Sequence, residues 1–108
     1  MKKFSDLTLC DSRGKQRNIH IRVSGDDNGL YFSGDEGGSD VDDFWGDDDY
    51  EYWYDLDAGN AEKLLKLIGG EDNPENALKR EFSGKGGLLK ITALCDQNNI
   101  KYSFNSYV

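Results

Sequence analysis

The stretch that decides the fold is residues 50–68, YEYWYDLDAGNAEKLLKLI, in which a strand pattern passes directly into a helix pattern. In its first seven residues, alternate side chains point to opposite faces of an extended strand, so the tyrosines and the first leucine share one face and Trp53 lies on the other. Asp57 can cap the helix that follows, and Gly69-Gly70 favours a left-handed stop. The buried stripe predicted for this helix is Ala61, Leu64, Leu65 and Ile68.

The chain before this stretch has the alternation of a β-meander. Apolar and polar residues alternate with a period of two around residues 7–9, 19–23 and 30–32. Residues 11–14 and 26–29 are rich in Asp, Asn, Ser and Gly, which favour tight turns. We therefore expect a three-stranded antiparallel meander, which the strand pattern described above extends to four strands.

The chain after residue 70 predicts one or two further helices and a closing strand. Asn73-Pro74 is typical of a helix start, residues 88–95 have apolar side chains at helical spacing, and residues 100–104 alternate again. Because most strands precede the helices, we expect an α+β fold. The predicted domain, residues 1–108, has a mainly antiparallel sheet of about five strands, a meander of four plus a C-terminal strand, packed against two or three helices.

The charge of the chain is concentrated in one segment. Residues 35–57 contain eleven acidic residues and no lysine or arginine, whereas the rest of the chain has ten acidic and thirteen basic residues. This segment therefore accounts for the whole net charge of −8. Residues 34–49 have no sustained period and are predicted to be a long surface loop.

Aromatic residues interrupt the acidic segment, which distinguishes it from an acidic solubility tail. Clustered carboxylates repel one another, and a cationic partner relieves that repulsion. Tryptophan and tyrosine are frequent energetic anchors of protein interfaces, although tyrosines on the inner face of the strand at 50–56 are better explained as core. We expect the partner-binding residues to be Asp42, Asp43, Trp45, Asp47, Asp48, Asp49, Glu51, Trp53 and Asp55.

The acidic Asp/Trp/Tyr segment, the helix pattern from Leu88 to Asn98 and the ending Asn99–Phe104 together resemble small bacterial immunity proteins of contact-dependent inhibition and polymorphic toxin systems. The resemblance is one of organisation and size, and it spans most of the chain. It implies a cytoplasmic protein without catalytic activity that binds one cognate toxin and protects the cell that makes the toxin. A basic nuclease fits as that toxin, because acidic side chains can occupy a cleft that holds phosphates.

The net charge, the lack of long apolar stretches and the few cysteines and histidines limit which functions the chain can have. A net charge of −8 disfavours nucleic acid and anionic membranes as partners, and no stretch has the apolar length of a signal peptide or membrane span. Cys10 and Cys95 lie in apolar patterns, which indicates buried free thiols, and His20 lies in a strand pattern. We therefore expect a cytoplasmic protein, a monomer when free, with no cofactor.

Two alternative functions compete with toxin binding. Residues 24–35 match an EF-hand loop in part, but the first position is Ser24 and the last is Asp35. A calcium-binding acidic domain, or a generic protein-interaction domain with no toxin partner, is therefore the alternative hypothesis. Catalysis is the least supported class, because carboxylates occur without a histidine cluster, an activated nucleophile or a cofactor loop, so we expect no catalytic and no metal-ligating residues.

Overall fold

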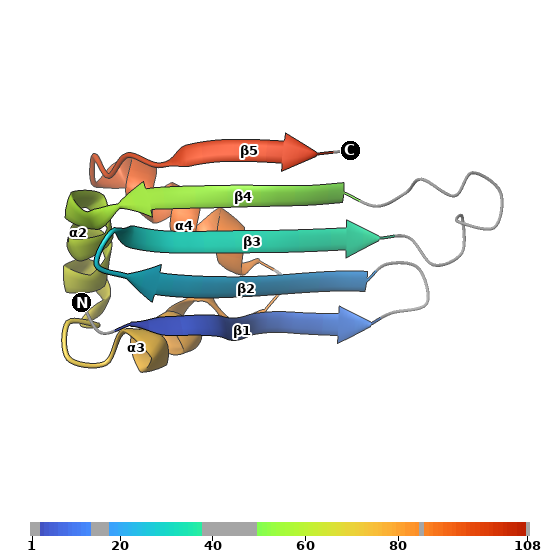
Figure 1. Cartoon of the computed structure of the whole chain (residues 1–108), viewed down its shortest axis with the longest axis horizontal. Helices are drawn as coiled ribbons and strands as arrows, with labels where there is room; N and C mark the ends of the chain where they lie inside the picture. Colours follow the sequence, from blue (N-terminus) through green and yellow to red (C-terminus); the bar gives the residue numbers. More distant parts are fainter. Residues whose placement is uncertain (1–2, 14–17, 38–49, 85, 108) are drawn as a thin grey trace, which may run out of the picture.

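The computed structural model describes residues 3–13, 18–37, 50–84 and 86–107. It shows one antiparallel sheet with the strand order β1-β2-β3-β4-β5, together with three helices that follow one another between β4 and β5 (Figure 1). The elements are β1 (Phe4–Arg13), β2 (Asn18–Asp26), β3 (Gly29–Gly37), β4 (Tyr50–Asp57), α2 (Ala58–Ile68), α3 (Pro74–Phe82), α4 (Gly87–Gln97) and β5 (Ser103–Tyr107). The predicted α+β fold, with a meander of four strands and a closing C-terminal strand, is confirmed.

The three helices lie on one face of the sheet, and the hydrophobic core lies between the two layers (Figure 1). The sheet contributes alternate residues to this core, because side chains of a strand point to opposite faces. Tyr52 on β4 is buried, and Tyr54 is half-buried beside it. The tyrosines therefore belong to the core side, as expected. The largest fully buried side chains are Phe32, Phe82, Ile21, Leu30, Leu56, Leu64, Leu78 and Ile91.

The helices α2 and α3 begin where their capping residues predict. Asp57 accepts a hydrogen bond from the backbone N–H of Asn60 at 2.9 Å, and α2 ends at Gly69, whose φ of 71° is left-handed. Asn73 caps α3 in the same way, through Asn76, with Pro74 as the first helical residue. Every residue of the predicted stripe of α2 is buried. None of the described helices has the length and apolar character needed to cross a membrane.

Two strands are longer than their sequence patterns suggested. The prediction of a loop from residue 34 is wrong over residues 34–37, which belong to β3 and pair with β4. Gly34 fits this strand because the ring of Tyr52 fills the space where a side chain would stand. The turn predicted at residues 11–14 is also misplaced, since β1 continues to Arg13 and pairs there with Asn18.

The closing strand starts three residues later than predicted. Ile100 is buried, but its backbone N–H donates to the carbonyl of Cys95 at 2.9 Å, so this residue completes the exit from α4. The next backbone N–H, of Lys101, donates to the Asn60 side chain at 3.0 Å. Both donors are therefore used before the chain reaches β4, and β5 begins only at Ser103.

The cysteines and the histidine have the roles that their patterns indicated. Cys10 and Cys95 are both buried and free. Burial raises the pKa of the Cys95 thiol to about 11, with a smaller contribution from the Asp96 carboxylate. His20 is a half-exposed strand residue whose Nδ1 lies 3.5 Å from an Asp11 carboxylate oxygen.

Candidate functional site

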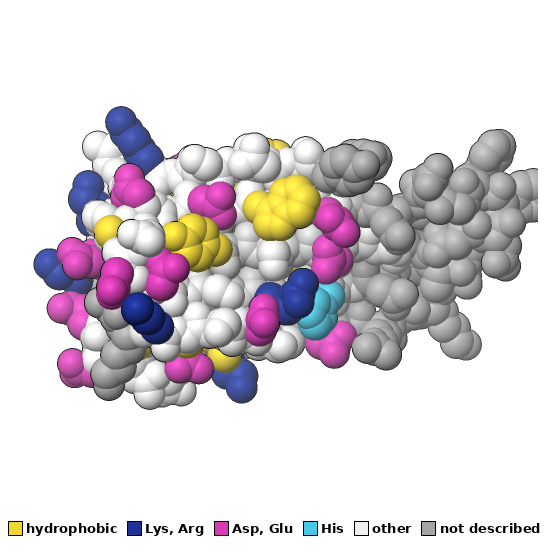
Figure 2. Space-filling model, viewed as in Figure 1, with side chains coloured by type: hydrophobic (Ala, Val, Ile, Leu, Met, Phe, Trp, Pro, Cys, Tyr) yellow, Lys and Arg dark blue, Asp and Glu magenta, His cyan; other side chains and the backbone are white. Residues whose placement is uncertain are grey.

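The face of the sheet opposite the core carries the candidate site. No described helix packs on this face. Figure 2 views the face directly and shows separate hydrophobic groups among acidic side chains. The strand registers and the alternation of buried and exposed residues define which side chains point outward. We call this surface the open face: Thr8, Asp11, His20, Arg22, Ser24, Tyr31, Ser33, Asp35, Glu51, Trp53, Asp55, Ser103 and Asn105.

Trp53 is at the middle of the part of the open face formed by β3, β4 and β5. Its cross-strand neighbours are Ser33 on β3 and Asn105 on β5, and both are small enough to leave the indole ring 37% exposed. Along β4 it is flanked by Glu51 and Asp55, which point to the same face. An exposed tryptophan between two carboxylates is therefore present, as the alternation of β4 predicts.

Negative charge predominates on this half of the open face. Three side chains of this half are acidic, Asp35, Glu51 and Asp55, and the sequences of β3, β4 and β5 contain no lysine or arginine. On β2, the Arg22 guanidinium lies 3.8 Å from an oxygen of Asp35 and 4.0 Å from one of Asp6. These contacts are exposed to solvent and therefore weak, so the carboxylates of β4 face water without a basic neighbour on their own or adjoining strands.

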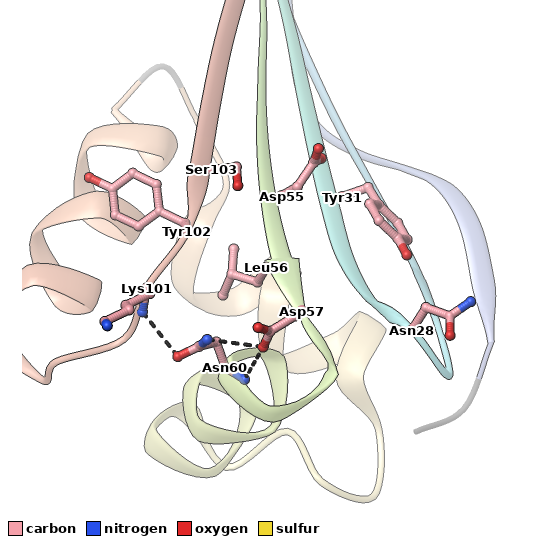
Figure 3. A pocket seen from close by; sticks show the side chains of 9 residues that line it. All are labelled: Asn28, Tyr31, Asp55, Leu56, Asp57, Asn60, Lys101, Tyr102 and Ser103. Atoms are coloured by element: carbon pink, nitrogen blue, oxygen red, sulfur yellow. Dashed lines mark hydrogen bonds between the residues drawn. The ribbon is translucent and has the colours of Figure 1, made fainter.

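A shallow hollow of about 350 Å³ adjoins the open face where β4 passes into α2 (Figure 3). Tyr31 and Asp55 project into its rim from neighbouring strands, whereas Tyr102 turns towards α4. Asn60 closes the base by donating to the Asp57 carboxylate at 2.9 Å and accepting from the Lys101 backbone. The full lining is Asn28, Tyr31, Asp55, Leu56, Asp57, Asn60, Lys101, Tyr102 and Ser103.

Hydrogen bonds at the base of the hollow favour the charged form of the Asp57 carboxylate. Hydrogen bonds from the backbone and side chain of Asn60 lower the pKa of Asp57. Partial burial of the Tyr31 hydroxyl raises the pKa of that tyrosine, and the nearby Asp26 carboxylate raises it further, so the hydroxyl stays neutral. At pH 7 the arrangement therefore offers aromatic surface and fixed negative charge, the combination that attracts lysine and arginine side chains.

The predicted partner-binding residues fall into two groups. Glu51, Trp53 and Asp55 lie together on the open face. The other six lie outside the described residues: Asp42, Asp43, Trp45, Asp47, Asp48 and Asp49.

The structure adds residues to the candidate site that the sequence interpretation missed. Tyr31 and Asp35 on β3, and Ser103 and Asn105 on β5, share the open face with Trp53. The alternation of β3 contained the signal for the first two, because Leu30 and Phe32 are buried and their neighbours must point outward. The two β5 residues could not be assigned to this face before the pairing of β5 with β4 was known.

The partial EF-hand match does not form an ion-binding loop. Asp26 and Asp35 lie near opposite ends of β3, about 20 Å apart for six residues of extended chain. Asp26 also accepts hydrogen bonds from the Asn28 backbone at 2.8 Å and from the Tyr31 hydroxyl at 3.4 Å. Across the described part of the chain, no three His, Cys, Asp or Glu residues gather in a way that could hold a metal ion.

Comparisons with protein-family models, curated proteins and solved structures give no match to this chain. The open face combines an accessible aromatic ring, carboxylates on either side of it, and small polar neighbours that leave them accessible.

Proposed function

We propose that this protein is an immunity protein, which binds and neutralises a cognate toxin with a basic surface, a nuclease being the toxin class that fits best. The observation that carries the proposal is the exposure of Trp53 between Glu51 and Asp55, on a sheet face that no described helix covers. The carboxylates would orient a cationic partner, and the indole ring would anchor it.

The division of the sheet into a packed face and an open face supports a binding role. The helices bury one face of the sheet in the core. Residues on the open face can therefore be substituted without disturbing the packing that holds the fold. The acidic residues of β3 and β4 border the segment 38–49, which carries the other predicted binding residues. Together these acidic residues would offer a nuclease the negative charge that phosphates carry.

The proposed protein acts in the cytoplasm as a monomer, without a cofactor and without catalysis. Its toxin partner would be encoded beside it, because an immunity protein must be made together with its toxin. Neutralisation requires only that the partner's basic cleft be occupied or its approach to nucleic acid blocked. Both modes rely on the same acidic and aromatic surface.

Co-production with the protein encoded next to its gene tests the proposal. We expect a complex that survives gel filtration at low salt, weakens as salt rises, and restores growth to cells that make the neighbouring protein. The matched test variant combines Glu51→Gln with Asp55→Asn. It keeps the size of both side chains but removes their charge, and it should lose much of the rescue. Absence of both complex and rescue would refute the toxin partner.

A further inference from the structure

The two edges of the sheet differ in how well they are protected from pairing with another strand. The β1 edge has two register shifts, and Asp6 within it has a positive φ of 52°. Charged residues, irregular register and bulges are the features by which native sheets block their edges. The β1 edge therefore has several of these protections.

The β5 edge has none of them. Its sequence, SFNSY, contains no charge and no proline, and its five residues pair with β4 in continuous register. Among the strands that the structure describes, β4 is its sole neighbour. The backbone groups on the other side of β5 are thus available to a further strand.

The side chains of β5 also suit an added strand. On the core side, Phe104 packs against Tyr54 with ring centroids 4.9 Å apart, yet remains 49% exposed. On the open face, Ser103 and Asn105 are short and leave Asp55 and Trp53 accessible from the edge. An added strand with apolar residues on its core side would cover the Phe104 ring. Long basic residues on its other side could reach over Ser103 and Asn105.

We infer that the outer edge of β5 accepts an extended segment of a basic partner protein as a sixth strand. Such a strand lies two strand spacings, about 10 Å, from β4. Lysine or arginine side chains span much of that distance and would meet Asp55 across Ser103, with their stems against Trp53. This inference deepens the proposed function and rests on it for the identity of the natural partner.

Charge favours a basic partner over a second copy of this chain. Self-pairing through β5 would bring together two chains of net charge −8 and place the carboxylates of each β4 near those of the other. A basic segment would instead neutralise them. Strand addition also supplies main-chain hydrogen bonds for affinity and alternate side chains for specificity.

The test uses a nine-residue peptide of alternating lysine and valine, acetylated and amidated at its ends. Its control is the same peptide methylated at every backbone nitrogen, which keeps the charge but cannot donate backbone hydrogen bonds. We expect the first peptide to bind with a Kd below about 1 mM and to slow hydrogen exchange of the β5 amides by about tenfold. The methylated peptide should do neither.

Two protein variants separate the edge of the sheet from its face. Asn105→Lys and Ser33→Lys place the same charge on either side of Trp53, but only the first lies on β5. Edge pairing predicts about a tenfold loss of peptide affinity in Asn105→Lys and about twofold in Ser33→Lys. Circular dichroism of both variants verifies that they fold.

Three kinds of outcome would overturn the inference. Equal losses in the two variants, or equal binding of the two peptides, would mean that the peptide lies on the open face as a polycation. No binding at 1 mM would mean that the edge does not accept a strand. A dimer in sedimentation without peptide, with β5 amides already protected, would identify a second copy as the occupant. Loss of toxin rescue with peptide binding intact would instead count against the proposed function alone.

Discussion

The aromatic ring of Tyr52 on β4 occupies the space that the absent side chain of Gly34 leaves on β3. The two residues are direct cross-strand partners, and the pair lies on the core side of the sheet. The glycine at which the sequence pattern predicted the start of a loop is therefore a packing requirement of the strand.

Replacing Gly34 by alanine should destabilise the fold by about 1–3 kcal/mol, because the new methyl group would collide with the Tyr52 ring. Urea unfolding measures this change. Gly59→Ala is the matched control, since the nearest atom to a methyl group there is an Asp57 oxygen at 3.8 Å, in ordinary contact. Similar losses in the two variants would show that the Tyr52 contact is not the cause.

The cap of α2 should make stability depend on pH in the acid range. The pKa of Asp57 is lowered in the folded chain, so its stabilisation is present above the unfolded value of about 3.9 and disappears as pH falls through the folded value. Asp57→Asn keeps a capping oxygen without the charge. The urea midpoint of the native chain should exceed that of the variant near neutral pH, and the difference should shrink below about pH 4. A constant difference would contradict this assignment.

Substitutions at adjacent positions of β4 should have opposite effects on folding and binding. Trp53→Ala should leave the thermal transition nearly unchanged and speed dissociation of the toxin about 30-fold, equivalent to about 2 kcal/mol. Tyr52→Ala should lower the unfolding free energy by about 3 kcal/mol, because the ring is buried. Calorimetry and surface plasmon resonance separate the two effects. An unfolded Trp53→Ala variant would place that ring in the core.

Neutralising Asp47, Asp48 and Asp49 together with asparagine should slow association with the toxin about tenfold at low salt and flatten its salt dependence. Stopped-flow mixing at several salt concentrations measures the rate. A control with the same change in net charge replaces Glu62, Glu71 and Asp72, which are exposed on α2 and the segment after it. Equal slowing in both variants would show that net charge, and not the acidic segment, controls association.

Local patterns in the sequence predict most of this fold. Alternation places the strands, and the caps at Asp57 and Asn73 place the starts of α2 and α3. Strand ends are less predictable, because they depend on partners distant in sequence. Gly34 belongs to a strand only because Tyr52 packs against it. Ile100 lies outside β5 because its backbone N–H donates to the Cys95 carbonyl at the end of α4.

The candidate site is predictable from the sequence to the extent that it lies on one strand. Alternation alone assigns Glu51, Trp53 and Asp55 to a common face of β4. The contribution of Asn105 depends on β5 returning beside β4 after three helices, a pairing that no local pattern specifies. The exposed edge follows from the same long-range pairing.

The bridge made by Asn60 has a consequence for the order in which the native structure opens. Its side chain bonds both to Asp57, at the start of α2, and to the Lys101 backbone, just before β5. Detachment of the last strand therefore disturbs the first turn of a helix 41 residues earlier in the chain. The two regions should behave as one cooperative unit in native-state hydrogen exchange, with shared opening free energies, whereas without the bridge β5 would fray independently.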